Sequence, residues 1–303
     1  MTEADAAARL WGGVVRRPLR LRENEVYEIA TGQGRAALRL HRMGYQSAEA
    51  IRSELWWCAQ LAQNGLPVPA ACPLPDGAFL ATLASGRLAS VVEWVEGEAL
   101  GEAGMPLSGS SADQAKKHHA LGRLLARLHD VTDRLTLPAW FTRPRWDHAG
   151  LVGDTPFWGR FWEHPSLTAS EANVLNDARA WLSHYLGSRS LATGLVHADV
   201  LRENILVKDG ALSLIDFDDS GFGFKIYDLG TVLSQNLYEP AYVDIRAALC
   251  EGYGLVDPGA VDPFTLARTL ASVGWAAPRL PVNSPIHRSH IDRAVMFARR
   301  CLG

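Results

Sequence analysis

The feature that most constrains the fold of this chain is a run of polar residues set between short apolar segments over residues 194–218. Residues 194–196 and 205–207 are apolar, residues 208–210 read Lys-Asp-Gly, and residues 211–215 are again mostly apolar. An Asp-Gly pair between two such runs is a strong signal for a β-hairpin with a tight turn. We therefore predict a strand, a polar loop and a two-stranded hairpin, in that order.

The polar residues fall at the ends of these predicted strands. Asp199 opens the loop, Asn204 closes it, and Asp216 follows the return strand. A carboxylate can orient a substrate hydroxyl, and amide and carboxylate oxygens are ligands that Mg²⁺ prefers. Asp and Asn are also common turn residues, so each one alone is readily explained as structural. The order H-x-D-x-x-x-x-N, hairpin, D-F-D nevertheless favours a phosphoryl-transfer site.

The same segment resembles the catalytic and metal-binding loops of the aminoglycoside phosphotransferase family, within the wider protein-kinase-like fold. The resemblance is strongest to bacterial homoserine kinase-like, choline kinase-like and stress-response kinase-like members, and it continues through residues 218–224 and 227–230. It implies that Asp199 is the catalytic base or hydroxyl-orienting group and that Asn204 and Asp216 are magnesium ligands.

The resemblance also implies supporting roles for neighbouring residues. Asp228 would brace the catalytic loop from a following helix, and His197 would pack and brace the backbone. Asp218 lies two residues beyond a predicted metal ligand, so it could reach a metal ion or cap the next turn. Arg202, inside the loop, could clamp a phosphate or an acidic substrate, or it could be a solvated arginine.

A second group of residues near the amino terminus fits the same chemistry. Residues 26–30 and 36–41 alternate as in a β-hairpin, and residues 47–61 follow as an amphipathic helix with Ser47 as its cap. Arg39 on the strand and Glu54 on the helix form the natural pair to hold nucleotide phosphates. An exposed strand cation and a solvated helix acid are the alternative interpretation of this pair.

Two departures from the family pattern concern this predicted nucleotide-binding region. This strand position most often holds a lysine in the family, and here it holds Arg39. The planar guanidinium group of arginine is not interchangeable with the ammonium group of lysine. Residues 21–27 contain no G-x-G-x-x-G string, although polar turn residues with free N–H groups can still cradle phosphate. Arg22 and Asn24 are the candidate nucleotide contacts in this loop.

The strand predicted over residues 88–95 looks like the one that enters the hinge of kinase-like folds, after a shorter run at 79–83. Backbone groups near Glu93, Trp94 and Val95 would then bind the adenine edge. The Trp94 side chain could flank the purine or pack in the core.

The remaining chain has a helical pattern. We predict helices over residues 113–132, 232–237, 241–253 and 263–275, the last of them broken by residues 276–279 around Pro278. A tryptophan-rich region between the first two of these helices could wall a substrate cleft or fill the core; it includes Trp158, Phe161, Trp162 and Trp181.

Composition agrees with a soluble two-lobed enzyme and argues against several other classes. The net charge is −3, and the basic residues are spread along the chain, which disfavours nucleic-acid or anionic-membrane binding. No apolar run has membrane-spanning length, and the amino terminus lacks the pattern of a signal peptide. The four cysteines show no metal-binding spacing. A cytoplasmic location with reduced thiols is the expectation.

Together these features predict an α+β protein of bilobal protein-kinase-like fold. We expect a small antiparallel-sheet nucleotide-binding lobe over residues 1–97 and a larger, mainly helical catalytic lobe over residues 98–303. The predicted activity is ATP- and Mg²⁺-dependent phosphoryl transfer to a hydroxyl of a small molecule: an amino alcohol, a homoserine-like acid, a sugar or an antibiotic.

Two other functions remain open at this point. One is a serine/threonine protein kinase of the stress-response type, which the short segment between Asp216 and Asp228 disfavours. The other is a nucleotide-binding pseudokinase, suggested by Arg39 and the glycine-poor loop. Among small-molecule acceptors, Asp218 and Asp219 mildly favour a cationic one.

Overall fold

The computed structural model describes residues 2–21 and 24–303. The predicted nucleotide contact of Arg22 therefore lies outside the described residues. By its internal contacts the chain divides into two compact units. Unit 1 contains the described residues up to 98, with 134–143 and 206–218, and unit 2 contains 99–133, 144–205 and 219–303.

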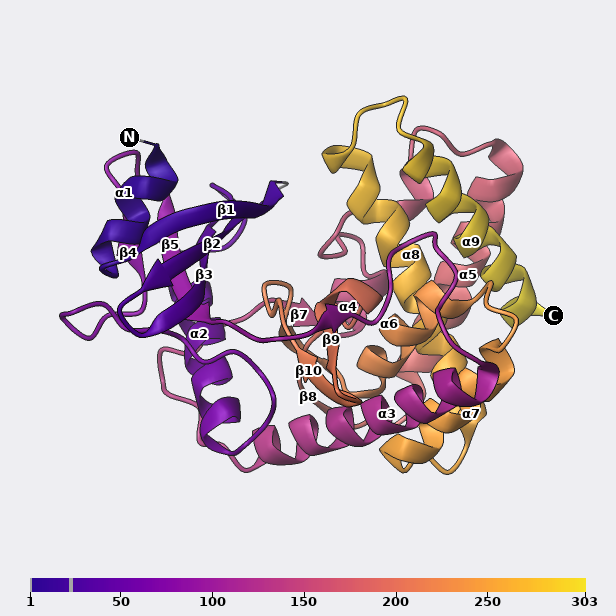
Figure 1. The fold of residues 1–303 in the computed structure, drawn as a ribbon. Helices are drawn as coiled ribbons and strands as arrows, with labels where there is room; N and C mark the ends of the chain where they lie inside the picture. Colours follow the sequence, from indigo (N-terminus) through magenta and orange to yellow (C-terminus); the bar gives the residue numbers. More distant parts are fainter. Residues whose placement is uncertain (1, 22–23) are drawn as a thin grey trace. The chain divides into compact units, whose positions relative to one another are not determined.

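Unit 1 is built on an antiparallel sheet, whose strand order in the described residues is β1-β2-β3-β5-β4. The strands are β1 (Val14–Leu21), β2 (Glu25–Thr31), β3 (Gly34–Leu40), β4 (Ala81–Thr82) and β5 (Leu88–Glu93). The predicted hairpin is thus formed by β2 and β3 (Figure 1). Helix α1 (Glu3–Leu10) packs its alanines with the apolar side chains of this sheet, among them Ile29, Leu38 and Val91.

Helix α2 (Ala48–Gln63) follows the hairpin and begins at the predicted cap, because the Ser47 hydroxyl accepts a hydrogen bond from the Ala50 N–H at 3.2 Å. The predicted Asp-Gly hairpin is also present, as β9 (Ile205–Lys208) and β10 (Ala211–Leu214). Its turn places Asp209 at φ 50° and Gly210 at φ 80°, the positive values that a tight hairpin turn requires. The two strands form a small sheet with β6 (Glu98–Ala99) in the order β10-β9-β6.

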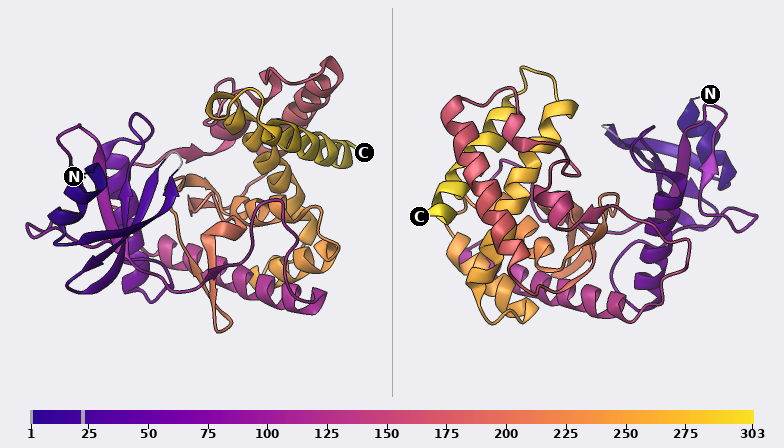
Figure 2. Two further views of the ribbon diagram at one scale, coloured as in Figure 1. Left: turned by 45° about the horizontal axis from the view of Figure 1, so that its top comes forward. Right: turned by 180° about the vertical axis from the view of Figure 1, so that it is seen from behind.

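Unit 2 is mainly helical. Its described helices are α3 (Ser111–Asp133), α4 (His148–Val152), α5 (Ala169–Gly187), α6 (Ile226–Asn236), α7 (Tyr242–Tyr253), α8 (Asp262–Arg279) and α9 (Pro285–Leu302), with short 3₁₀ turns η1 (Phe161–Glu163), η2 (Arg202–Asn204) and η3 (Pro258–Val261). A small sheet has the order β7-β11-β8, with strands β7 (Arg145–Trp146), β8 (Thr193–Val196) and β11 (Gly221–Phe224). Helix α3 runs along α7, and α8 packs against α9 (Figures 1 and 2).

The core of unit 2 accounts for most of the tryptophan-rich region. Trp158 and Phe161 are buried in the main apolar cluster, and Trp162 and Trp181 pack against it. Trp146 stacks on Tyr227 and meets Trp158 edge to face, at ring-centroid distances of 5.4 and 4.7 Å. The interpretation of these residues as core is therefore correct, although Trp158 also contacts an arginine of the candidate site.

The structure corrects two helix boundaries. Helix α8 is not broken at residues 276–279 but continues to Arg279 with Pro278 inside its last turn. A proline there removes only one hydrogen bond near the end of the helix, and the Leu280 N–H still donates to the Ala276 carbonyl at 3.1 Å. Helix α6 begins at Ile226, earlier than the predicted start at 232, which places Asp228 in its first turn.

Candidate active site

The loop that carries Asp199 is held by Asp228 from α6. The buried Asp228 carboxylate accepts hydrogen bonds from the backbone N–H groups of His197 at 2.9 Å and Ala198 at 2.7 Å, and it contacts His129 Nε2 at 3.1 Å. Ala198 has φ 64°, a conformation that costs free energy in a non-glycine residue and persists only where the surroundings hold it. The predicted bracing role of Asp228 is confirmed.

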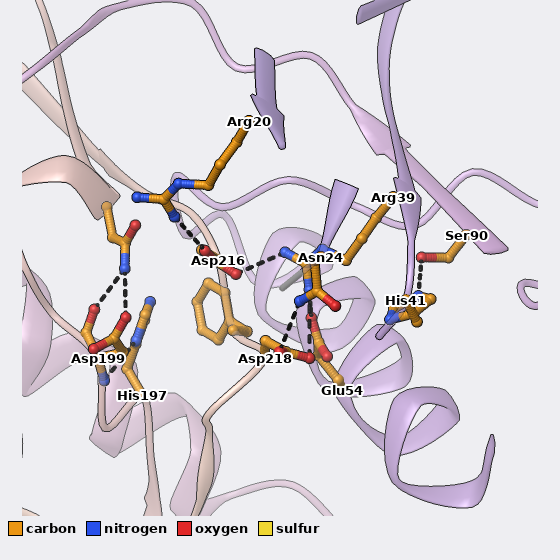
Figure 3. Close-up of polar contacts among 12 residues, drawn as sticks. Arg20, Asn24, Arg39, His41, Glu54, Ser90, His197, Asp199, Asp216 and Asp218 are labelled. Atoms are coloured by element: carbon orange, nitrogen blue, oxygen red, sulfur yellow. Dashed lines mark hydrogen bonds and ion pairs between the residues drawn. The ribbon is translucent and has the colours of Figure 1, made fainter. Parts of the chain in front are cut away.

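Asp199 and Asn204 lie together within unit 2, as the sequence predicts. The Asn204 side-chain nitrogen donates to the Asp199 carbonyl and to Asp199 Oδ2, each at 2.9 Å. Because both acceptors are oxygens, the amide nitrogen must face Asp199 and the amide oxygen must face away. Asn204 Oδ1 therefore has no hydrogen bond in the described residues and is available as a ligand. The His197 ring accepts from the Asp199 N–H at 3.3 Å (Figure 3).

The other carboxylate oxygen of Asp199 is bound by an arginine that the sequence analysis missed. Arg268 of α8 donates through Nη2 to Asp199 Oδ1 at 2.7 Å, and its guanidinium carbon lies 4.6 Å from the centre of the Trp158 ring. Arg268 is 4% exposed, so this is a largely desolvated charge pair. Arg268 is far from Asp199 in the sequence and belongs to no motif. A single sequence therefore gives no indication that the two residues are partners.

The structure contradicts both interpretations of Arg202, as a clamp for a phosphate or acidic substrate and as a solvated arginine. Its side chain is buried rather than solvated, and its donors are used by protein acceptors: Asn236 Oδ1, the Met105 carbonyl at 2.7 Å and Glu239 at 2.5 Å. No donor group of this arginine is directed to a phosphate. Arg202 instead ties the loop over residues 199–204 to the end of α6 and to the segment before α3, so its role is structural.

The predicted pair of Arg39 and Glu54 is present in unit 1. Arg39 Nη1 donates to Glu54 Oε1 at 3.0 Å, and Arg39 Nη2 donates to Asp216 Oδ1 at 2.8 Å (Figure 3). Arginine can make both contacts because two different nitrogens of its guanidinium group donate to the two carboxylates. A lysine would have to make both contacts from one nitrogen. The alternative of an exposed strand cation is wrong, since the Arg39 side chain is only 17% exposed.

Burial and the surrounding charges shift the pKa values of Arg39 and Glu54 in opposite directions. Burial lowers the pKa of Arg39, but the carboxylates of Asp216, Glu54 and Asp218 outweigh it and the net shift is upward. Burial raises the pKa of Glu54 to about 7 against the opposing effect of Arg39. Arg39 therefore stays charged, and three carboxylates crowd around it in unit 1.

Asp216 and Asp218 differ in their surroundings. Asp216 Oδ2 also accepts from Arg20 at 3.3 Å, and Asp216 has φ 65°, a second strained non-glycine residue next to predicted chemistry. Among the described residues Asp218 caps no turn. It accepts a hydrogen bond from Asn24 Nδ2 at 2.8 Å and lies 3.8 Å from Arg39. Asn24 Oδ1 in turn accepts the Arg42 N–H at 2.8 Å. The Asn24 side chain thus links Asp218 to the end of the β3 strand.

The residues predicted to hold Mg²⁺ carry donor atoms that suit it. Asp216 and Asp218 offer carboxylate oxygens in unit 1, and Asn204 offers its free amide oxygen in unit 2. Within the described chain no group of three or more His, Cys, Asp or Glu side chains could hold a metal ion unaided. Mg²⁺ characteristically takes one or two protein carboxylates and completes its shell with phosphate and water, and Asp216 and Asp218 of unit 1 fit that number.

The predicted hinge lies at the end of β5. The Glu93 N–H donates to the Ala70 carbonyl at 2.9 Å, while the backbone groups of Val95 have no partner in the described residues. The half-buried Trp94 ring stacks under Arg35, whose guanidinium carbon lies 3.9 Å from the ring centre. A cavity of about 510 Å³ within unit 1 is lined by Pro67, Val68, Trp94, Val95, Glu96, Lys208, Asp209, Ala211 and Ser213. Adenine contacts by Glu93 and Val95 stay predictions.

A cation-rich region lies near Asp199 in unit 2. Arg293 of α9 donates through Nη2 to His290 Nδ1 at 2.7 Å, and the His290 ring lies 6.4 Å from Trp275, which in turn lies 6.4 Å from Trp158. Burial, followed by the charges of Arg293 and Arg268 and by smaller effects of His287 and His164, lowers the pKa of His290 to about 3. His290 is therefore neutral at pH 7.

This shift predicts an acid-sensitive stability. The pKa of this histidine is lower in the folded state than in the unfolded state. Its contribution to the free energy of unfolding is therefore present above the unfolded pKa and is lost as the pH falls towards the folded pKa. For His290 the loss between pH 7 and pH 5 is roughly 1–2 kcal/mol. We expect urea unfolding of His290→Asn to show a smaller drop in unfolding free energy over this interval than wild type. Equal drops in the two proteins would contradict the assignment of a depressed pKa to His290.

The chain is similar to several known proteins. Residues 15–264 match the phosphotransferase enzyme family. A homoserine kinase of Sinorhizobium fredii (strain NBRC 101917 / NGR234) is 29% identical over 222 residues, which cover 72% of this chain and 61% of that protein. A homoserine kinase of Methylobacillus glycogenes is 30% identical over 217 residues, covering 68% of this chain and 58% of that protein.

Solved structures show the same fold. A microcompartment-associated aminopropanol kinase has a TM-score of 0.81 and 29% identity, covering 98% of this chain and 93% of that one. Amicoumacin kinase hAmiN, in complex with AMP-PNP, Ca²⁺ and Ami, has a TM-score of 0.74 and 19% identity, covering 95% and 88%. The fold is therefore kinase-like and of the α+β class, as predicted.

The chain belongs to the phosphotransferase enzyme family, and the predicted resemblance is confirmed. The matched region spans about three-fifths of the length of the curated relatives. In the described residues, no helix is long and apolar enough to cross a membrane.

Proposed function

We propose that this chain transfers the γ-phosphoryl group of ATP to a hydroxyl group of a small molecule, with Mg²⁺ as the metal ion. The observation that carries the proposal is the orientation of Asn204, whose nitrogen fixes Asp199 while its oxygen has no hydrogen bond within the described residues. One side chain thereby serves the two roles that phosphoryl transfer requires at this position, because it positions the base and offers a metal ligand. The family and the kinase-named relatives support the same activity.

In this proposal each residue has a defined role. Asp199 orients the acceptor hydroxyl and takes its proton, which then passes to solvent. The acceptor oxygen forms a bond to the γ-phosphorus while the bond from that phosphorus to the bridging oxygen of ADP breaks. Arg39, held by Glu54, binds the phosphates, and Asn204, Asp216 and Asp218 would hold the metal ion. When bound, that ion neutralises charge on the triphosphate.

The segment after Asp216 favours a small acceptor over a protein substrate. Residues 221–224 form β11, which pairs with β7 and β8, and Ile226 already begins α6. This part of the chain lies wholly within the described residues and contains no extended activation segment. A peptide-docking surface of the kind that protein kinases build from that segment is therefore lacking here.

One experiment separates the three functions that the sequence leaves open. AMP-PNP binding is measured with and without Mg²⁺, and ATP consumption is then screened against amino alcohols, homoserine, sugars, aminoglycosides and protein mixtures. We expect Mg²⁺-dependent binding and turnover with a small alcohol. Turnover with protein alone would indicate a protein kinase, and binding without turnover across the whole panel would indicate a pseudokinase.

The role of Arg39 gives a separate prediction. Replacing Arg39 with methionine leaves Glu54 and Asp216 without their shared partner and removes a phosphate contact. We expect KM for ATP to rise roughly 10- to 100-fold, which corresponds to the loss of a charge-assisted hydrogen bond. Arg17→Met is the matched control, because Arg17 is an exposed arginine of the same sheet that pairs with Glu28. An unchanged KM for ATP in Arg39→Met would remove Arg39 from the nucleotide site.

A further inference from the structure

Two arginines near Asp199 have buried N–H donors for which the described residues supply no acceptor. Arg268 gives only its Nη2 to Asp199, and its Nε and Nη1 are buried with no hydrogen-bond partner in the described residues. Arg293 gives its Nη2 to His290, and its Nε is likewise buried and unpartnered there. Leaving buried donors of a charged group unsatisfied is costly, so these nitrogens require an acceptor from elsewhere.

The charge around these arginines is also unbalanced. Asp199 is the carboxylate that contacts Arg268, and no carboxylate within the described chain forms an ion pair with Arg293. Burial and the neighbouring charge of Arg268 together lower the pKa of Arg293 to about 10. Arg293 therefore remains charged at neutral pH, and an anion placed between the two guanidinium groups would relieve their repulsion.

The surroundings resemble a binding site more than a structural ion cluster. Trp158 lies against the guanidinium of Arg268, and Trp275 lies between Trp158 and His290. Because His290 Nδ1 accepts a hydrogen bond from Arg293, the neutral ring carries its proton on Nε2, a donor with no acceptor among the described residues. Aromatic walls with a few convergent donors are typical of small-molecule sites.

We propose that Arg268, Arg293 and His290 form an oxyanion subsite for the acceptor, so that the molecule phosphorylated carries a carboxylate or phosphate group near its reactive hydroxyl. The inference rests on the proposed function, since Asp199 marks where the hydroxyl is placed. A single guanidinium group, that of Arg268, would contact both Asp199 and the bound anion. The acceptor is therefore small, with only a few bonds between its hydroxyl and its anionic group.

This subsite reverses the mild preference for a cationic acceptor drawn from Asp218 and Asp219. The Asp218 carboxylate accepts a hydrogen bond from Asn24, lies beside Arg39 and is a proposed metal ligand, so it is not assigned to the acceptor. The unsatisfied groups beside Asp199 are cationic.

Matched acceptors test the proposal with the full-length protein. L-Homoserine and 3-aminopropan-1-ol differ by a carboxylate, and 3-hydroxypropyl phosphate and propane-1,3-diol differ by a phosphate group. We expect the anionic member of one pair to have the lower KM, and the pair that shows the difference identifies the anion. In Arg293→Gln that KM should rise at least about tenfold, while KM for ATP and for the uncharged or cationic member should change less than about twofold.

Two further variants serve as a control and as a rescue. Arg299→Gln removes an exposed arginine from the same helix and should change none of these constants. Arg293→Lys retains the charge and should recover part of the loss, and thermal unfolding of all variants shows whether they remain folded. Equal KM values within both pairs in wild type, or a rise of KM for ATP alone in Arg293→Gln, would overturn the proposal.

A binding measurement separates this proposal from the proposed function. Tryptophan fluorescence is titrated with L-homoserine and with 3-hydroxypropyl phosphate in the absence of ATP, because Trp158 and Trp275 lie beside the subsite. Saturable binding that Arg293→Gln weakens, in a protein that phosphorylates no acceptor, would support the subsite and refute the kinase activity. Turnover of uncharged alcohols without any Arg293-dependent binding would support the kinase activity and refute the subsite.

Discussion

Replacing Asp199 with alanine is expected to lower kcat by about 10²- to 10⁴-fold, the usual contribution of a positioned general base. The dissociation constant for AMP-PNP should stay within about twofold of wild type, because the variant loses the partner of the acceptor hydroxyl and no phosphate ligand. Steady-state kinetics on an acceptor found in the screen gives the first value, and equilibrium titration gives the second.

The same substitution removes the carboxylate that faces Arg268, so its effect on folding must be measured alongside. Losing one partner of a buried charge pair costs about 3–5 kcal/mol. Asp199→Asn keeps an oxygen that Arg268 can reach and should be more stable than Asp199→Ala while being similarly inactive. Asp209→Asn is the control, since asparagine tolerates the positive φ of that hairpin turn. A folded Asp199→Asn variant with wild-type turnover would show that Asp199 is not the base.

The second large effect is expected at Asp228. Asp228→Ala leaves the N–H groups of His197 and Ala198 without acceptors inside the core and takes away the partner of His129. We expect the free energy of unfolding to fall by about 3–5 kcal/mol, which is large beside the total stability of a domain. Urea unfolding at pH 7 measures it, with Asp244→Ala on the exposed side of α7 as the control.

The Asp228 variant should also be inactive in any fraction that folds, because Ala198 would lose the contacts that hold its unusual backbone conformation. Limited proteolysis should then cut within residues 197–204, where wild type resists. A variant as stable as the control, with an uncut loop, would mean that the loop is held by other contacts.

Much of the fold and part of the site could be predicted from local patterns. The Asp-Gly turn identified the β9–β10 hairpin because positive φ values at two successive residues restrict the sequence strongly. Ser47 and the helical spacing after it located α2, and hence Glu54 opposite Arg39. Asp199 and Asn204 were placed together because only four residues of loop separate them.

The parts that were missed depend on contacts between residues distant in sequence. Arg268 and Arg293 come from helices α8 and α9, and nothing local distinguishes them from surface arginines. Arg202 was misjudged for the same reason, since Glu239 and Met105 that bury it are far away in the chain. Helix α1 was overlooked although Thr2 and Asp5 form a capping box that the sequence does display.

The central claim is that the chain transfers a phosphoryl group from ATP to a small alcohol through Asp199, and a product analysis tests it most directly. Purified protein is incubated with ATP, Mg²⁺ and each acceptor of the matched pairs, and ³¹P NMR with mass spectrometry identifies the products. A phosphate monoester formed in step with ADP, by wild type and not by Asp199→Asn, is the predicted result. ADP release without any phosphorylated acceptor, or equal ester formation by both proteins, would contradict the claim.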